Sequence, residues 1–372
     1  MKTQLKTSLK TPEMVVVRLS HKEFLKIDKD YEKAAAVAAL VYVNDKEPGI
    51  SRSKKGKGFS FIYDNKPLRG KKELERIRKL AIPPAWTNVW ICTLPNGHIQ
   101  ATGFDIRNRK QYRYHHLWHT LRNQTKFHRL FEFGKALPAL RLQLEKDLTL
   151  KELCQEKVIA AVISVMERTY IRIGNQDYEK LYGSYGLTTL KDKHVTINGS
   201  KMMFAFKGKK GIHHNVTLKN KRLAKVVESC RELPGKELFQ YLDPEGNLCG
   251  VDSGTVNNYL KTATEGDFSA KDFRTWAGSL NILRAFKSLG EAEDESNCKK
   301  NVTAAIDEVS KKLGNSRTIC RKYYIHPGLI KLYEENNLNK YLSELNEIEE
   351  PDNRAGLTSE EKILMKILQS LH

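Results

Sequence analysis

The chain has 372 residues, enough for two domains with separate hydrophobic cores. Its 64 Lys and Arg residues exceed its 44 Asp and Glu residues, and the resulting net charge of +20 favours a polyanionic partner, most commonly nucleic acid. Six scattered cysteines form no CxxC pair and have no ligand-like spacing with histidines, which argues against a structural zinc site and favours a reducing compartment. The longest apolar run, Ala34 to Val43, is too short to span a bilayer, and the N-terminus lacks the apolar core of a secretory signal. We therefore expect a soluble intracellular protein.

The first third of the chain has the pattern of a small β-rich domain. Aromatic and β-branched segments typical of short strands occupy residues 59–63, 89–93, 98–102 and 111–115. Pro95-Asn96-Gly97 is a hairpin signal between the second and third of these segments. A charged helix is expected over residues 71–80, because the following prolines end it. We assign residues 1–120 to this N-terminal domain.

Beyond residue 120 the apolar residues recur with a helical period. One stripe in residues 155–170 consists of Val158, Ile159, Val162, Ile163 and Met166. A second stripe consists of Phe273, Trp276, Leu280 and Leu283, and a third of Val302, Ile306, Val309 and Leu313. Gly314 is well suited to end the third helix. These segments predict a mainly α-helical second domain, residues 121–372.

The period changes to two between Gly186 and Leu218. Strand-like residues 194–197 and 202–206 flank an Asn198-Gly199 turn, and Gly208-Lys-Lys-Gly211 leads to a third strand. The prediction is a small antiparallel sheet with a basic hairpin tip, which makes the whole protein α+β. The C-terminal tail is acidic over 334–352 and amphipathic over 357–371, a stretch that either docks on the body or binds a partner.

Tyr324 lies among cations in a short segment with the pattern of a helix. Arg317, Arg321 and Tyr324 are spaced at i, i+4 and i+7 and share one helical face, while Asn315 or Ser316 is expected to cap this helix. A tyrosine with a pKa of about 10 is a poor nucleophile at neutral pH, and cations that hold an anionic substrate would help it react. The alternative is a surface tyrosine beside solvated arginines.

Further cations lie near the edges of predicted elements. Arg172 follows the first apolar stripe, Lys209 lies at the hairpin tip, and Arg274 flanks Phe273 and Trp276. A flexible lysine at a hairpin tip can reach a phosphodiester. Each residue alone is equally compatible with a solvated or salt-bridged side chain, and spacing does not bring them together.

Several motifs together resemble those of a known enzyme family. In chain order they are Ile82-Pro-Pro-Ala-Trp-Thr-Asn-Val-Trp90, Lys110-Gln-Tyr-Arg-Tyr114, Arg172-Ile-Gly-Asn175 with Tyr178, Ser184-Tyr-Gly-Leu-Thr-Thr-Leu190, Gly208-Lys-Lys-Gly211, Lys271-Asp-Phe-Arg-Thr-Trp276, and Gly314-Asn315 with Tyr324. Their order and spacing, over residues 55–330, resemble the type IB DNA topoisomerases, and the N-terminal motifs resemble the small poxvirus and bacterial branch. The resemblance implies a catalytic domain with a tyrosine recombinase-like fold, and relaxation of supercoiled double-stranded DNA.

The resemblance also implies roles for individual residues. Tyr324 would attack a DNA phosphodiester to form a 3′-phosphotyrosyl bond, and Arg172 and Arg274 would hold the non-bridging oxygens. Lys209 would protonate the departing 5′-oxygen. Asn315 stands where many relatives have histidine, which suggests that a neutral donor to the phosphate suffices. These protein cations would neutralise the phosphate, so no metal or other cofactor is expected. The covalent bond would preserve the phosphodiester energy, so religation would need no ATP.

The N-terminal domain would clamp DNA, as the resemblance implies. Gln111, Tyr112 and Tyr114 match DNA-contacting positions of the family, and Tyr178 has a similar status. The alternative for these tyrosines is burial within strands. Tyr323 competes with Tyr324 as nucleophile, but the spacing from Asn315 and the following Ile-His-Pro favour Tyr324.

Two other functions fit part of the pattern. A site-specific tyrosine recombinase would use a similar Arg, Lys, Arg and Tyr set, although such enzymes usually have histidine where this chain has Lys271. A non-catalytic basic nucleic-acid-binding protein would bind DNA in a salt-dependent way without a covalent adduct. We expect a monomer without membrane contact, located in the cytoplasm and associated with the nucleoid if the source is bacterial.

Overall fold

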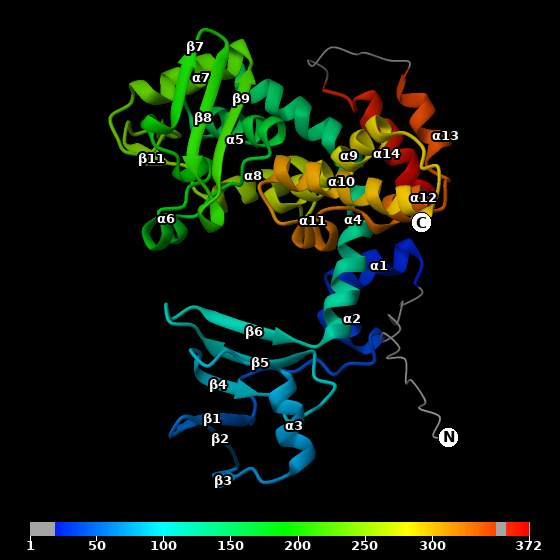
Figure 1. The fold of residues 1–372 in the computed structure, drawn as a ribbon. Helices are drawn as coiled ribbons and strands as arrows, with labels where there is room; N and C mark the ends of the chain where they lie inside the picture. The colour runs from blue at the N-terminus through cyan, green and yellow to red at the C-terminus, as the bar shows by residue number, and fades with distance from the viewer. Residues whose placement is uncertain (1–18, 347–354, 372) are drawn as a thin grey trace. The chain divides into compact units, whose positions relative to one another are not determined.

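A computed structural model describes residues 19–346 and 355–371. The chain divides into two compact units, Met1–Arg129 and Leu130–His372, which Figure 1 shows as ribbons. The division falls inside one long helix, α4 (His116–Leu148). The domain boundary predicted at residue 120 lies in the same helix.

An antiparallel sheet forms the body of the N-terminal unit. Its strands are β1 (Ile50–Lys55), β2 (Gly58–Tyr63), β3 (Lys66–Pro67), β4 (Thr87–Ile91), β5 (Ile99–Phe104) and β6 (Lys110–Tyr114), in the spatial order β3-β2-β1-β4-β5-β6. The four predicted strands correspond to β2, β4, β5 and β6, and the predicted hairpin joins β4 to β5. The sequence reading missed β1, because its Ser-Arg-Ser-Lys-Lys run lacks apolar alternation and its pairing with β2 supplies the strand.

Helices complete the two small cores of this unit. They are α1 (His21–Asp28), α2 (Tyr31–Val37) and α3 (Lys71–Lys79), the last of which was predicted. Ile77 of α3 packs against Ile50, Val89 and Ile91 of the sheet. Phe24 of α1 packs with Trp118 of α4 in a separate cluster. The sheet and α4 thus have separate apolar contacts.

The second unit is mainly helical, as predicted. Its helices are α5 (Gln155–Thr169), α6 (Gln176–Tyr182), α7 (Lys221–Glu232), α8 (Ser253–Thr264), α9 (Ala270–Leu289), α10 (Glu295–Leu313), α11 (Arg317–Tyr323), α12 (Pro327–Glu334), α13 (Asn339–Leu342) and α14 (Ser359–Ser370). The predicted stripes of α5, α9 and α10 are all buried in one core. Helical periodicity therefore identified the faces that pack inward.

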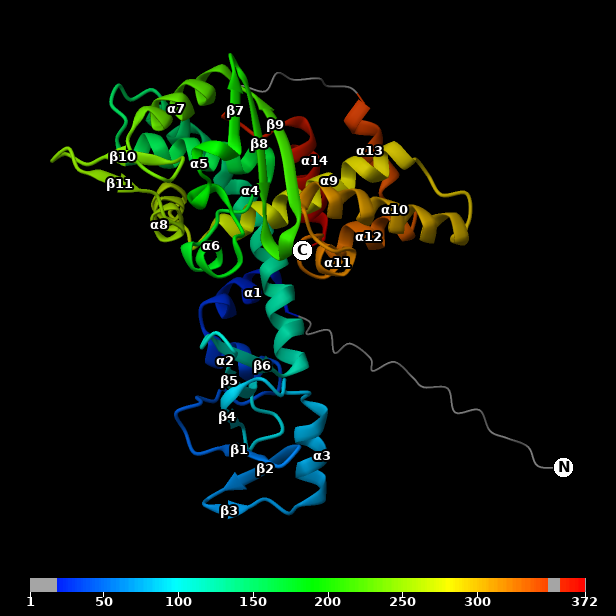
Figure 2. The same ribbon diagram turned by 60° about the vertical axis from the view of Figure 1, so that its left-hand side comes forward.

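A small antiparallel sheet lies on one side of this unit (Figure 2). It consists of β7 (Val195–Asn198), β8 (Lys201–Lys207) and β9 (His213–Lys219), and a short hairpin, β10 (Gln240–Leu242) and β11 (Leu248–Gly250), lies apart from it. β8 and β9 alternate between buried or half-buried and exposed residues, and Lys207 pairs with His213 next to the predicted basic turn. The turn residues therefore project from the end of a regular hairpin.

The C-terminal amphipathic stretch docks on the body of its own unit. Helix α14 buries Ile363, Leu364, Ile367 and Leu368. Glu361 accepts a hydrogen bond of 3.0 Å from the indole of Trp276 and pairs with Arg141 at 2.6 Å. Residues 347–354 of the predicted acidic segment lie outside the described residues. Docking is therefore the correct alternative for residues 357–371.

No helix within the described residues is long and apolar enough to cross a lipid bilayer.

Candidate active site

The backbone around Tyr324 is set by its contacts with α9. Tyr324 lies just beyond the last residue of α11, and its N–H donates to the Cys320 carbonyl at 2.9 Å. A Cβ atom on Gly278 would lie 2.3 Å from the Tyr324 carbonyl oxygen, so only glycine allows this approach. Two residues later the His326 N–H donates to the Ser279 hydroxyl at 3.1 Å. Helix α9 therefore holds the segment that carries the phenol.

The capping prediction for α11 was only partly correct. Ser316 occupies the N-cap position, yet its side chain accepts no capping hydrogen bond. Arg317 forms an ion pair with Asp307 at 2.5 Å. Asn315 instead directs its side-chain oxygen to Arg172, which donates a hydrogen bond to it. Tertiary contacts thus take precedence over the local capping signal.

Arg274 lies directly beside the phenol. Its guanidinium carbon is 5.1 Å from the centroid of the Tyr324 ring, and the side chain is only 5% exposed. Nη1 donates to the Tyr170 carbonyl and Nη2 to the Leu313 carbonyl, both at 2.6 Å. The Tyr324 phenol interacts with the guanidinium by charge and hydrogen bonding, while the buried Nε makes no well-formed hydrogen bond within the described part of the chain. Burial lowers the pKa of Arg274, but an arginine remains charged at neutral pH.

Arg172 brings a second guanidinium to the same place. Its Nη2 donates to the Gly314 carbonyl at 3.0 Å as well as to the Asn315 side chain. Burial, followed by repulsion from Arg274, lowers the pKa of Arg172 to about 10. Two partly desolvated cations that repel each other are stabilised by an anion placed between them. The pair is therefore suited to a phosphate group.

Asn315 adds a neutral donor. Its oxygen faces Arg172, which leaves the side-chain NH2 pointing elsewhere. This buried group makes no well-formed hydrogen bond among residues 19–346 and 355–371, and the neighbouring Cys320 thiol, with which it interacts, is only a weak acceptor. A buried donor without a partner costs about 1–3 kcal/mol. A ligand oxygen would remove that cost.

Lys209 lies on the β8–β9 turn, close enough to the cluster for the charges of Arg172 and Arg274 to act on its ammonium. The side chain is exposed in part, and its Nζ lies 5.5 Å from the centroid of the Tyr178 ring. Partial burial, and then the positive charge of Arg172, lowers the pKa of Lys209, while the Tyr324 phenol has the opposite effect. The structure therefore brings together all five predicted catalytic residues, Tyr324, Arg172, Lys209, Arg274 and Asn315.

Sequence reasoning missed two residues of this cluster. His214 of β9 lies beside Gly314, and burial followed by the charges of Arg172 and Arg274 lowers its pKa to about 4. Cys320 is fully buried, and its burial raises the pKa of the thiol to about 11. The alternating pattern of β9, in which His214 takes an inward position, could have indicated His214. No sequence pattern around Cys320 indicates that it belongs to the cluster.

The predicted DNA-binding residues of the N-terminal unit lie on β6. The Gln111 amide donates to Asp105 at 3.1 Å, and the Tyr112 and Tyr114 rings stack with centroids 5.7 Å apart. Tyr112 is exposed, whereas Tyr114 is half-buried. The alternative interpretation, that the tyrosine is buried within its strand, is therefore wrong for Tyr112. In the other unit Tyr178 is also exposed, on α6.

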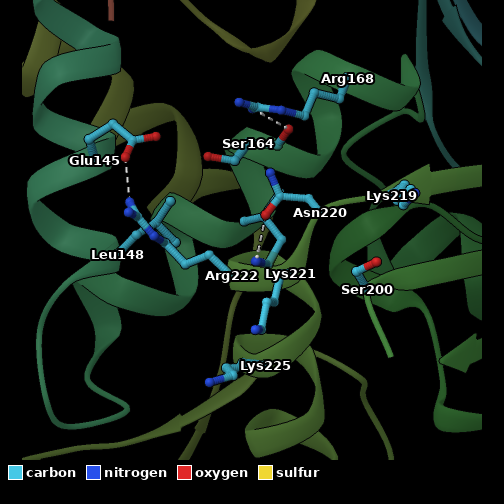
Figure 3. Close-up of a pocket in the computed structure, with 11 residues that line it drawn as sticks. Glu145, Leu148, Ser164, Arg168, Ser200, Lys219, Asn220, Lys221, Arg222 and Lys225 are labelled. Carbon is cyan, nitrogen blue, oxygen red and sulfur yellow. Dashed lines mark hydrogen bonds and ion pairs between the residues drawn. The ribbon is translucent and has the colours of Figure 1, made fainter. Parts of the chain in front are cut away.

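A separate basic hollow of about 770 Å³ lies at the end of β8 and β9 that is farther from the Lys209 turn (Figure 3). Among the described residues, those that line it include Arg168, Lys219, Lys221, Arg222 and Lys225, but none of the predicted site residues. Arg222 forms an ion pair with Glu145 across it. This hollow adds to the basic surface and is distinct from the Tyr324 cluster.

Comparison with known proteins identifies the class to which this fold and cluster belong. Residues 115–350 match the family described as "Eukaryotic DNA topoisomerase I, catalytic core", and residues 58–105 match "Bacterial DNA topoisomerase IB, N-terminal domain". The chain therefore belongs to the type IB DNA topoisomerases, and it is an enzyme that relaxes supercoiled DNA.

Its relatives lie in the small viral and bacterial branch. The DNA topoisomerase 1B of Acanthamoeba polyphaga mimivirus is 33% identical over 296 residues, which cover 77% of this chain and 88% of the viral protein. The DNA topoisomerase 1B of Vaccinia virus (strain Copenhagen) is 23% identical over 242 residues, 63% of this chain and 72% of its own. The DNA topoisomerase I of Monkeypox virus is 22% identical over 239 residues, with the same shares. The family resemblance seen in the motifs is confirmed.

Proposed function

We propose that Tyr324 is the nucleophile of this topoisomerase. Its Oη attacks a DNA phosphorus, the P–O5′ bond breaks as the P–Oη bond forms, and a 3′-phosphotyrosyl bond and a 5′-hydroxyl result. Because one phosphodiester replaces another, the reverse attack by the 5′-hydroxyl reseals the strand without ATP. The observation that carries this proposal is the doubly anchored Arg274 guanidinium, 5.1 Å from the Tyr324 ring.

Arg172, Arg274 and Asn315 hold the phosphate in this mechanism. The buried Nε of Arg274 and NH2 of Asn315 support this assignment, because neither makes a well-formed hydrogen bond and a phosphate oxygen would satisfy both. Donors placed in advance around a developing negative charge stabilise the transition state. These side chains perform the neutralisation that a metal would otherwise supply, and the reaction proceeds without one.

Lys209 protonates the leaving O5′. Its ammonium loses a proton as the P–O5′ bond breaks, and Lys209 takes the proton back during religation. The lowered pKa of Lys209 supports this role, because a weaker hold on the proton brings the group closer to the operating pH. Its place on an exposed turn lets it approach a bound strand.

DNA binding extends beyond the phosphate at the cleavage site. Gln111, Tyr112 and Tyr114 contact DNA from an N-terminal clamping domain, and Tyr178 contacts it from the catalytic domain. The exposure of Tyr112 and Tyr178 supports this assignment. The protein acts as a monomer, because one chain supplies the whole cluster, and in a bacterial source it works in the cytoplasm, associated with the nucleoid.

The nucleophile is tested with a duplex that carries a nick close to the cleavage site, so that the short 5′-hydroxyl strand diffuses away and the adduct accumulates. Tyr324→Phe abolishes the covalent adduct, and Tyr323→Phe, the matched control, retains it. The reverse pattern would assign the chemistry to Tyr323.

A plasmid assay tests whether the enzyme relaxes DNA without a metal, without ATP and without a defined pair of sites. Wild-type enzyme relaxes any supercoiled plasmid in EDTA without ATP. A requirement for a divalent cation would contradict the proposed role of the arginines, and dependence on a defined pair of sites would indicate recombination. Binding that weakens with salt but yields no adduct would indicate a binding protein only.

A further inference from the structure

His214 is wedged between two segments of the cluster. It lies opposite Phe206 in the β8–β9 ladder, and the two rings stack with centroids 5.0 Å apart at 12°. A Cβ atom on Gly208 would lie 2.6 Å from His214 Cδ2, and one on Gly314 would lie 2.5 Å from His214 Cε1. The imidazole therefore fills the space against both glycines, and a side chain at either position would displace it.

The two glycines lead directly into residues of the reaction. Gly208 precedes Lys209 and closes its turn, since its N–H donates to the Ile212 carbonyl at 2.7 Å. Gly314 precedes Asn315, and its carbonyl accepts from Arg172 at 3.0 Å. One ring thus connects the lysine turn to the segment that holds the phosphate-binding groups.

The contact depends on packing and adds no charge. Arg172 and Arg274 are the charged groups that act on His214, and together with burial they keep its imidazole neutral near pH 7. A protonated ring here would add a third cation to the cluster. A neutral, flat and rigid side chain can separate two backbone segments by a constant distance.

Lys209 needs such a support. Its side chain is a flexible four-carbon stem, so the position of the ammonium depends on where the turn is held. The turn contains Lys210 with φ of +61°, a left-handed conformation at a non-glycine residue. A displacement of about 1 Å at a reacting group can slow a reaction by about 100-fold.

We propose that His214 is a positioning residue, whose ring holds the Lys209 turn against the 314–315 segment so that Lys209 can protonate the leaving 5′-oxygen. This inference rests on the proposed general-acid role of Lys209. It assigns to His214 no contact with DNA.

The test compares two substrates in single-turnover cleavage. One is an ordinary duplex, and the other has sulfur in place of the bridging O5′ at the cleavage site. Because a thiol has a pKa of about 8.5, the thiolate leaving group departs without being protonated. A defect in proton delivery by Lys209 therefore disappears on the sulfur substrate. We expect His214→Ala to cleave the ordinary duplex about 10–100-fold more slowly and the sulfur duplex at nearly the wild-type rate. DNA affinity, measured by fluorescence anisotropy, stays unchanged.

Companion variants separate positioning from folding. Lys209→Ala shows the same sulfur-reversible defect, and His213→Ala, an exposed neighbour on the opposite face of β9, cleaves both duplexes normally. Gly208→Ala has a permitted backbone, with φ of −94°, but its Cβ strikes the imidazole. It therefore reproduces the defect without altering His214. The double variant Gly208→Ala/His214→Ala is no slower than His214→Ala, because both changes disturb one contact.

The outcomes distinguish this inference from the proposed function. Equal slowing of His214→Ala on both duplexes, or no slowing on either, overturns the positioning role. A Lys209→Ala defect that sulfur does not reverse overturns the general-acid assignment and the inference with it. An adduct formed by Tyr324→Phe overturns the nucleophile assignment alone.

Discussion

Gly278→Ala tests whether α9 sets the position of the nucleophile. This change adds one methyl group and alters no polar group. The new Cβ would lie 2.3 Å from the Tyr324 carbonyl oxygen, 2.8 Å from its carbonyl carbon and 3.0 Å from its Cβ. An ordinary contact begins near 3.4 Å, so the Tyr324 backbone must move by about 1 Å or α9 must retreat by as much.

Gly278→Ala is expected to lower both the stability of the domain and the rate of DNA cleavage. Overpacking costs about 1–3 kcal/mol, and removal of glycine from a helix interior returns about 0.5–1 kcal/mol. The net loss of stability is therefore about 0–2.5 kcal/mol, too little to unfold a domain with an ordinary stability of about 5–15 kcal/mol. A displacement of about 1 Å at the nucleophile slows cleavage by about 100-fold. Gly278→Ala should therefore lose most of its cleavage rate while the domain remains folded.

The assay measures adduct formation on the nicked duplex and unfolding by urea. Gly250→Ala is the matched control, because a Cβ at Gly250 meets no atom of the described residues within 4 Å. It should retain the wild-type rate. A Gly278→Ala enzyme that cleaves at the wild-type rate, or one that loses rate only in proportion to its unfolded fraction, would refute the reasoning.

Three further predictions concern pH and stability. Glu361→Ala removes one of the two carboxylates that pair with the buried Arg141, the other being Glu167, and should lower the unfolding free energy in urea by less than the ~3–5 kcal/mol of a buried charge left with no partner. Burial opposes ionisation of Glu361, but the hydrogen bonds from Arg141 outweigh burial and lower the pKa of this carboxyl. The stabilisation by the pair is therefore present at neutral pH and is lost as the pH falls through the folded-state pKa of Glu361. Stability that does not change with pH in this range would contradict the pairing. Because burial and Arg172 lower the pKa of Lys209, the cleavage rate should fall with rising pH before an ordinary lysine titrates, and Lys209→Arg should lack that limb of the pH–rate profile. Cys320, buried with a thiol pKa raised to about 11, should react with a disulfide reagent only after unfolding, unlike the partly exposed Cys154; equal rates in the native protein would contradict the burial.

Features that follow from a single helix or strand were predictable from the sequence, whereas features that depend on contacts between distant segments were not. The stripe in α5 and the alternation in β8 were predicted because each follows from the geometry of a single element. Strand β1 was missed because its polar residues become a strand only through pairing with β2 and β4. Asn315 or Ser316 was expected to cap α11, but the Ser316 side chain makes no capping bond, and Asn315 pairs with Arg172, which lies 143 residues away.

By itself the sequence determined the strongly periodic elements, the basic character and the residue types that phosphate chemistry needs. Its motifs also determined the family, through order and spacing that match known relatives. Only the tertiary structure decided that Arg274 lies over the Tyr324 ring, that Lys209 reaches the same cluster, and that His214 separates Gly208 from Gly314. The physical reason is that periodicity specifies which face of an element is buried, whereas the neighbour it meets depends on packing between segments far apart in the chain.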